Sequence, residues 1–248
     1  MERNVAAIIL AAGLGTRMKS DLAKVLHPIL GRPMINYVLE TACRIAADNV
    51  VVVVGHQAEE VKRVCSEVPG IGFALQEKQL GTGHAVQCAM PHLADNMEDI
   101  LILCGDVPLL KAKTVKQLLD DHRDNKRVLS LLAVEVEQPR GYGRVIIDDH
   151  RNLSRIVEEA DATADEKEVN LINSGIYCVD KTFLDVSLAR ITPDNAQGEL
   201  YLTDIISIGY VNGQKIGVMI GDDELEVSGV NSIDDLAFVE QIFREKKA

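Results

Sequence analysis

Residues 8 to 26, IILAAGLGTRMKSDLAKVL, pass within a few positions from buried-strand residues to glycine, threonine, arginine and lysine. The apolar run predicts an interior strand, and the glycines after it allow a backbone to approach a ligand closely. Thr16, Arg17 and Lys24 add a hydroxyl and two cations. We therefore interpret this stretch as an anion-binding loop. An ordinary glycine-rich connection into a helix is the alternative that the glycines alone leave open.

The loop departs from two widespread phosphate-binding patterns. The order of strand, glycine turn and expected helix is that of the dinucleotide fingerprint G-x-G-x-x-G, but Met18 stands where the third glycine belongs after Gly13 and Gly15. A Walker A loop needs four residues between its glycines and a Lys-Ser/Thr pair after the second. An NAD-dependent oxidoreductase and a P-loop enzyme are therefore disfavoured.

Composition narrows the class of protein further. With 248 residues, 47% of them hydrophobic, the chain is long enough to bury a substantial core. A net charge of −12 opposes binding to nucleic acid. No apolar run reaches the roughly 20 residues that cross a bilayer, so no membrane partner is expected. Five scattered cysteines without a CxxC pair fit reduced thiols in the cytoplasm better than disulfides or zinc.

The spacing of apolar residues predicts an α/β fold. Short runs of Val, Ile and Leu without alternation are typical of parallel strands buried on both faces, and helical patterns lie between them. The strands are expected at 5 to 11, 50 to 54 and 99 to 104, and the helices at 35 to 46, where Pro33 suits the first turn, 57 to 68 and 111 to 122. We expect a doubly wound, mostly parallel, Rossmann-like sheet whose ligand crevice lies at the carboxyl ends of its strands.

The second half of the chain has a different pattern of apolar and polar residues. From about residue 128 the expected strands alternate more and are separated by turn-rich pieces, which predicts a mixed extension of the sheet. These strands lie at 128 to 137, 144 to 149, 153 to 159 and 172 to 179, and a final amphipathic helix covers 231 to 247, with Arg244, Lys246 and Lys247 at its end. No linker divides the halves, so one domain over residues 1 to 248 is expected.

Eight motifs, in order over nearly the whole chain, resemble the sugar-nucleotide pyrophosphorylase family. They are LAAGLGTRMKSDLAKVL, LQEKQLGTGHA, CGDVPLL, GYGRV, IVEEADAT, INSGIY, NAQGELYLTDI and EVSGVNS. The set is closely similar to the uridylyltransferase domain of the bifunctional UDP-N-acetylglucosamine pyrophosphorylase/glucosamine-1-phosphate acetyltransferases. The resemblance implies the nucleotide-diphospho-sugar transferase fold, with about 1 to 110 as the nucleotide-binding part and about 111 to 248 as the sugar-binding part.

The resemblance also implies a reaction. The phosphate of N-acetylglucosamine 1-phosphate attacks the α-phosphorus of UTP, giving pyrophosphate and UDP-N-acetylglucosamine, a peptidoglycan precursor. Two polyanions then have to be positioned and neutralised, with Mg²⁺ as the bridge. Arg17 is implied to face the leaving pyrophosphate and Lys24 the reacting phosphates, while Asp106 and Asn231 hold the metal. Arg17, Lys24 and Asp106 are thus the expected catalytic residues.

Purely structural roles are the alternative for several of these residues. Asp106 follows an apolar strand, at the expected rim of the crevice, but Asp before Val-Pro also begins turns. Asn231 or Ser232 fits the N-cap of the last helix, because Ser232 and Asp235 have the spacing of a capping box. His84 is expected to be a structural histidine at a helix start, since the attacking phosphate is already ionised and needs no base.

Substrate recognition is also carried over from the resemblance. Gln76 and Gly81 are implied to read uracil, because an amide both donates and accepts hydrogen bonds. Tyr201 and Thr203 are expected near the sugar, although core packing is an equal role for the tyrosine. The implied substrate-binding residues are Leu10, Ala11, Ala12, Gly13, Gln76, Gly81, Thr82, Cys104, Gly105, Gly143, Glu158, Asn173 and Asn231.

Two departures from the family pattern limit what is carried over. Cys104 stands where family members have a tyrosine, so the wall of the nucleotide pocket is expected to differ there. No hexapeptide repeats of the acetyltransferase half are present, so acetyl transfer is expected to be absent and the oligomeric state is left open. The alternatives are a sister enzyme that uses another sugar 1-phosphate or nucleotide, and a non-catalytic nucleotide sensor.

Overall fold

The computed structural model describes residues 3 to 149 and 152 to 245, which form an α/β fold around one large sheet. Within this part the strands are β1 Val5–Ala11, β2 Pro28–Ile29, β3 Arg32–Pro33, β4 Val50–Val54, β5 Gly72–Leu75, β6 Asp99–Cys104, β7 Leu129–Glu135, β8 Arg144–Ile147, β9 Leu153–Val157, β10 Leu171–Asp180 and β11 Ile216–Ile220. The α-helices are α1 Ile35–Ala46, α2 Ala58–Cys65, α3 Thr82–Ala89, α4 Ala112–Asp124, α5 Ala164–Lys167, α6 Lys181–Leu188, α7 Asp204–Val211 and α8 Ile233–Glu245. Lys246 and Lys247, expected at the end of α8, lie outside the described residues.

The sheet is doubly wound, as expected. Its strands follow the order β11-β7-β10-β6-β1-β4-β5, and β6, β1, β4 and β5 are all parallel to one another. The chain moves outward from β1 to β4 and β5 on one side, and then crosses to β6 on the other. The strand order therefore reverses between β1 and β6, and the carboxyl ends of these two strands mark the place where such sheets bind ligands.

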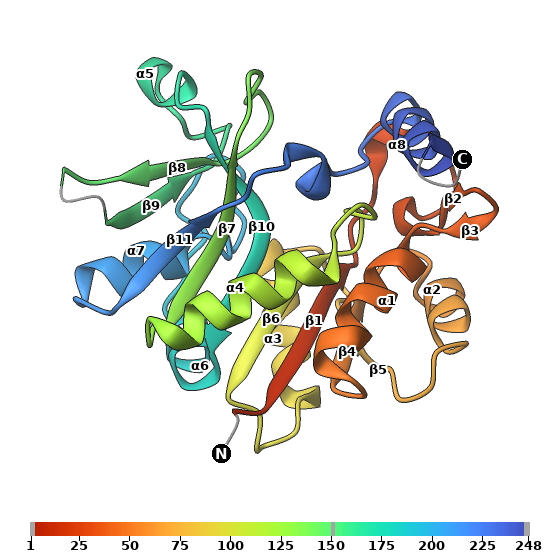
Figure 1. The fold of residues 1–248 in the computed structure, drawn as a ribbon, viewed down its shortest axis with the longest axis horizontal. Helices are drawn as coiled ribbons and strands as arrows, with labels where there is room; N and C mark the ends of the chain where they lie inside the picture. Colours follow the sequence, from red (N-terminus) through yellow and green to blue (C-terminus); the bar gives the residue numbers. More distant parts are fainter. Residues whose placement is uncertain (1–2, 150–151, 246–248) are drawn as a thin grey trace.

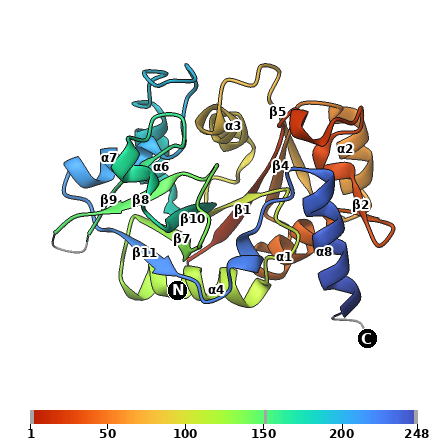
Figure 2. The same ribbon diagram turned by 90° about the horizontal axis from the view of Figure 1, so that it is seen from above.

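Helices cover both faces of the sheet because successive strand residues point to opposite sides. In β1, Ala7 and Ile9 pack toward the layer of α1, α2 and α4, whereas Ala6 and Ile8 pack toward the layer of α3, α6 and α7. Figures 1 and 2 show α1 and α4 on one side of the sheet and α3 on the other. The unbroken apolar composition of the strand is thus explained by burial on both faces.

The second half extends the sheet with mixed strand directions. β10 is antiparallel to both β6 and β7, β11 is parallel to β7, and β8 and β9 form an antiparallel pair beside β10. The expected alternation fails in β7, where six consecutive residues are buried. Because β7 lies between β11 and β10 and has a hydrophobic layer on each face, it has no solvent side for polar residues.

Two local expectations near the glycine loop were wrong. No α-helix follows the loop; the chain makes a 3-10 turn at Thr16–Met18, and Met18 is buried in the core. Pro33 lies in β3 and not in the first turn of α1, which begins at Ile35. The short hairpin of β2 and β3 takes up the chain between loop and helix, so the loop has no helix dipole behind it.

The last helix returns to the first half of the molecule. α8 packs through Val239 against Ile29 and Met34, and the rings of Tyr37 and Phe243 lie 4.6 Å apart between centroids. Figure 2 shows α8 beside α1 and β2. This packing brings the residues just before α8 to the carboxyl end of the parallel strands. None of the described helices is long and apolar enough to cross a lipid bilayer.

Candidate active site

A cleft of about 430 Å³ opens at the carboxyl ends of β1 and β6, where the strand order reverses. Most of the residues that the sequence pointed to lie in its wall. These are Leu10, Ala11, Ala12, Gly13, Lys24, Gln76, Gly81, Thr82, Cys104 and Asp106. Gly105 lies between two of them and donates its backbone N–H to the carbonyl of Leu10 at 2.9 Å, which ties the two strand ends together.

The glycine loop forms the floor of this cleft. Gly15 has a φ of +62°, and a Cβ there would stand 2.7 Å from the Cβ of Lys24. Any other residue would be strained and would displace the lysine. At Gly13 a Cβ would meet no atom within 4 Å, so this part of the loop is open toward the cleft. The loop thus leaves room beside an exposed backbone and fixes the position of Lys24.

Lys24 joins two residues from distant parts of the chain. Its Nζ donates to Asp106 Oδ2 and to Asn231 Oδ1, the second at 3.0 Å. Asn231 Oδ1 also accepts from the guanidinium of Arg17 at 2.7 Å. The four residues that the resemblance assigned to phosphates and metal therefore form one hydrogen-bonded group, which we call the cation cluster.

The segment around Asn231 caps the last helix through side chains other than that of Asn231. Asp235 donates its N–H to the Ser232 hydroxyl at 3.2 Å, and its carboxylate accepts from the N–H groups of Asn231 and Ser232 at 2.9 Å. Ser232 and Asp235 thus cap α8 in the manner of a capping box. The side-chain oxygen of Asn231 has no part in the cap and faces the cation cluster.

The wall of the cleft also carries a buried amide. Gln76 is only 3% exposed, and its Nε2 lies 3.0 Å from the carbonyl oxygen of Gly81 and 3.1 Å from Nδ1 of His84. A Cβ on Gly81 would stand 2.5 Å from the carbonyl oxygen of Leu200, which explains why a glycine is needed there. Gln76 and Gly81 thus lie side by side in the wall of the cleft, and we call the part of the cleft beside them the slot.

The three residues assigned to the sugar lie together next to the cleft. Asn173 donates its N–H to the carbonyl of Gly143 at 2.9 Å, and a Cβ on Gly143 would stand 3.2 Å from Glu158 Oε2. Burial raises the pKa of Glu158, although a hydrogen bond from the Thr203 hydroxyl at 3.2 Å opposes the shift. Tyr201 is buried, and its hydroxyl lies within hydrogen-bonding distance of Gln197 and Asp161. Its place beside the sugar stays a prediction.

Cys104 connects the nucleotide side to the sugar side. Its thiol lies 3.5 Å from the carbonyl oxygen of Gly175 in β10, the strand that also carries Asn173. Burial and, to a smaller extent, the carboxylate of Asp106 raise the pKa of Cys104 to about 12. The thiol is therefore protonated and a poor nucleophile at neutral pH, so this cysteine shapes the wall without covalent chemistry.

Comparison with known proteins agrees with this geometry. Residues 6 to 233 match the model of the nucleotidyl transferase family. The chain belongs to that family. A nucleotidyltransferase transfers a nucleoside monophosphate group from a nucleoside triphosphate to an acceptor and releases pyrophosphate.

The chain is also similar to individual proteins of known name. The chain is 44% identical over 246 residues to the bifunctional protein GlmU of Desulfotalea psychrophila and 49% identical over 243 residues to that of Pelobacter propionicus. These matches cover 99% and 98% of this chain but 72% and 53% of the relatives. A crystal structure from Bacillus anthracis, assigned as a glucose-1-phosphate thymidylyltransferase in complex with sucrose, shares the fold with a TM-score of 0.73 at 18% identity, over 96% of this chain and 94% of that one.

The cation cluster fits a divalent ion of the kind that this nucleotidyltransferase would use. Among the described residues no group of three or more His, Cys, Asp or Glu side chains gathers to hold a metal. However, Asp106 and Asn231 already direct oxygens at one cation, the Lys24 ammonium. Mg²⁺ commonly takes only one or two protein oxygens and completes its shell with water and substrate phosphates.

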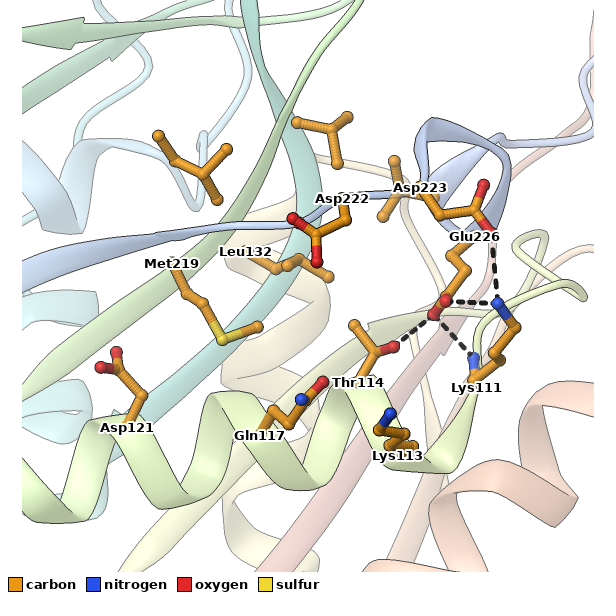
Figure 3. Close-up of a pocket in the computed structure, with 14 residues that line it drawn as sticks. Lys111, Lys113, Thr114, Gln117, Asp121, Leu132, Met219, Asp222, Asp223 and Glu226 are labelled. Atoms are coloured by element: carbon orange, nitrogen blue, oxygen red, sulfur yellow. Dashed lines mark hydrogen bonds and ion pairs between the residues drawn. The ribbon is translucent and has the colours of Figure 1, made fainter.

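A second hollow, of about 480 Å³, lies between α4 and the end of β11 (Figure 3). Carboxylates surround it, from Asp121, Asp222, Asp223 and Glu226, which makes it unsuitable for a phosphate. Glu226 is buried and accepts from Thr114 and from the Lys111 ammonium, and this bond raises the pKa of Lys111. The contacts of Glu226 in this hollow instead hold the segment that leads to Asn231 against the start of α4.

Sequence reasoning missed several residues of this arrangement. Gln79 and Glu199 line the cleft, and Tyr177 donates its hydroxyl to Asn173 Oδ1 at 2.9 Å. Gln79 and Glu199 stand inside motifs that were recognised, so their position beside the assigned residues was a usable signal. Glu226 is the first residue of the recognised motif EVSGVNS, but its buried contact to a helix more than a hundred residues earlier could not be predicted from a local pattern.

Proposed function

We propose that this nucleotidyltransferase is a Mg²⁺-dependent uridylyltransferase that forms UDP-N-acetylglucosamine and pyrophosphate from UTP and N-acetylglucosamine 1-phosphate. The observation that carries the proposal is the double contact of Lys24 with Asp106 and Asn231. It concentrates cations and hard oxygens in a cleft whose wall also holds the Gln76 amide. The similarity to bifunctional GlmU proteins over nearly the whole chain supports the choice of substrates.

The phosphates are held by charge and by backbone. Lys24 lies in the wall of the cleft, and the exposed Arg17 extends from the 3-10 turn beside it. On a protein with a net charge of −12, this local positive charge offsets the repulsion between the triphosphate and the sugar phosphate. We assign Lys24 to the reacting phosphates and Arg17 to the departing pyrophosphate. The sugar phosphate is ionised at neutral pH, so the residues need not remove a proton from it.

Asp106 and Asn231 would hold the magnesium ion. A bound Mg²⁺ would act there as a Lewis acid that stabilises the negative charge of the phosphates. The residues of the chain provide the rest: the open loop at Gly13 admits the triphosphate, and Lys24 keeps the two ligand side chains oriented toward the same point. Preorganised charge of this kind lowers the barrier because little reorganisation is needed during the reaction.

The two recognition sites fit an N-acetylated amino sugar and a pyrimidine. Glu158 offers a carboxylate to sugar hydroxyls, and Asn173 lies beside it with its amide. Gln76 and Gly81 flank the slot for the base. A sister enzyme with another sugar phosphate would keep the cation cluster and differ here, so this is where specificity has to be tested.

The test is a matrix of turnover assays. Each of UTP, dTTP, CTP and ATP is paired with glucose 1-phosphate, glucosamine 1-phosphate and N-acetylglucosamine 1-phosphate, and pyrophosphate release is followed with and without Mg²⁺. We expect the highest kcat/KM for UTP with N-acetylglucosamine 1-phosphate, and no turnover without the metal. Preference for dTTP or glucose 1-phosphate would contradict the proposed substrates, and binding of nucleotide without turnover would favour a sensor.

A further inference from the structure

We propose that His84 is a specificity-determining positioning residue: it holds the Gln76 amide so that the amide oxygen faces the cleft and selects a pyrimidine with an N3–H group, uracil or thymine, over cytosine. The inference rests on the proposed function only in taking the slot at Gln76 as the place of the base. It gives His84 a role beyond that of a structural residue at a helix start.

The orientation of the Gln76 amide follows from its two neighbours. The carbonyl oxygen of Gly81, 3.0 Å away, can only accept, so the amide must turn its NH₂ group and not its oxygen toward it. The second hydrogen of that NH₂ group points to His84 Nδ1 at 3.1 Å. Both donor positions are therefore used inside the protein.

The amide oxygen is left for the ligand. Among the residues that the structure describes, no donor reaches Gln76 Oε1, and this oxygen is not one of the buried atoms without a partner. Because Gln76 lines the cleft, its oxygen is available there as an acceptor. A base that carries a donor at this position is recognised, whereas one that carries a lone pair meets a second lone pair.

His84 is arranged to accept and not to donate. We assign its proton to Nε2, because Nδ1 faces the NH₂ group of Gln76, and Nε2 lies 3.8 Å from the thiol of Cys88 on the next turn of α3. The N-cap of α3 is Gly81, and no side chain caps this end of the helix, so His84 is not needed there as a cap. Its ring instead offers Nδ1 as the acceptor for the Gln76 NH₂ group.

The consequence is a choice between pyrimidines. Uracil and thymine have an N3–H that pairs with an acceptor, whereas cytosine has an unprotonated N3 that repels one. Without the His84 acceptor, the NH₂ group keeps only the Gly81 contact and the amide is less firmly oriented. We therefore expect removal of His84 to reduce the preference for uracil, chiefly by weakening UTP binding, while the chemistry at the distant cation cluster continues.

The experiment compares three variants with the wild type. His84→Leu removes the acceptor at similar volume, His84→Asn can restore an acceptor near the position of Nδ1, and His92→Leu makes the same change at an exposed histidine. For each, kcat and KM are measured with UTP and CTP, and the dissociation constants of UDP and CDP are measured by calorimetry. Loss of one oriented hydrogen bond predicts a fall of about tenfold in the UTP/CTP ratio of kcat/KM for His84→Leu.

The expected pattern is a higher KM for UTP with little change of kcat in His84→Leu, recovery of most of the ratio in His84→Asn, and wild-type behaviour in His92→Leu. An unchanged UTP/CTP ratio in a folded His84→Leu enzyme would overturn the inference, and so would a wild type that does not distinguish UDP from CDP. Preference for dTTP or for another sugar phosphate would refute the proposed substrates and leave this inference standing, since thymine carries the same N3–H.

Discussion

The Nζ of Lys24 and the Oδ1 of Asn231 lie 3.0 Å apart although 207 positions separate these residues in the chain. One comes from the loop after the first strand and the other from the segment before the last helix. Their contact, together with Asp106 after β6, means that three separate parts of the chain build the cation cluster. Each part can be tested by a substitution that preserves shape.

Asp106→Asn should abolish most turnover while leaving the fold intact. The amide keeps the volume and a polar contact to Lys24 but loses the negative charge that we assign to the metal. We expect kcat to fall on the order of a hundredfold to a thousandfold, as for other lost electrostatic contacts to a reacting centre. Pyrophosphate release measures the rate, and circular dichroism checks the fold. The exposed Asp95→Asn is the control, and equal rates in both variants would remove Asp106 from the site.

Lys24→Met should separate catalysis from metal binding. Methionine keeps the length of the side chain without its charge, so turnover should fall by about a hundredfold or more. In the absence of nucleotide, Asp106 and Asn231 then lose the ammonium that lies between them, and Mn²⁺ used as a probe should bind more tightly by calorimetry. Lys113→Met, at an exposed position on α4, should change neither quantity. Weaker Mn²⁺ binding in Lys24→Met would show that the lysine assists the metal and does not compete with it.

Glu226→Ala should reduce both stability and turnover. The buried carboxylate accepts from Thr114 and Lys111. Its removal leaves the half-buried Thr114 hydroxyl without its acceptor and takes from Lys111 one of its two carboxylate partners, the other being Asp223, at a cost of about 1 to 3 kcal/mol. The segment that carries Asn231 is then held less firmly. Urea denaturation and the turnover assay measure the two effects. The neighbouring exposed Glu224→Ala should show neither, and a stable, slow Glu226→Ala enzyme would point to a more direct role.

Glu158 should make the protein less stable as the pH rises. Because burial raises its pKa in the folded state, the folded protein holds this proton more tightly than the unfolded chain does. Its contribution is therefore most favourable at a pH below the ordinary carboxyl pKa and is lost as the pH rises through the raised value. The Tm measured between pH 4 and pH 8 should fall less with rising pH in Glu158→Gln than in the wild type. In the exposed Glu168→Gln it should fall as it does in the wild type.

Much of the fold could be predicted from local composition. β1, β4 and β6 were recognised because strands covered on both faces have an unbroken apolar sequence, and the order of elements between them implies parallel pairing. The insertion of β10 between β6 and β7 could not be predicted, because antiparallel pairing between strands far apart in the chain leaves no periodic signal. For the same reason β7 was expected to have a solvent face that it lacks.

The candidate site likewise has features that could be predicted from the sequence and features that could not. The motifs supplied the residue types, and the structure adds which of them touch. Asn231 carried two competing roles in the sequence; only the geometry shows that Ser232 and Asp235 form the cap and leave Asn231 to contact Lys24. His84 was expected to be structural because the attacking phosphate needs no base. Its contact with the Gln76 amide could not be predicted, because that contact depends on how α3 packs on the sheet.

The return of α8 to the first half of the molecule has a consequence for biosynthesis. A nascent polypeptide leaves the ribosome from its amino end, so β1, β4, β5 and β6 can pair while the residues from 229 onward are still inside the exit tunnel. At that stage Lys24 and Asp106 are present but Asn231 is not. The contact between Lys24 and Asn231 can therefore form only after residue 231 has left the ribosome.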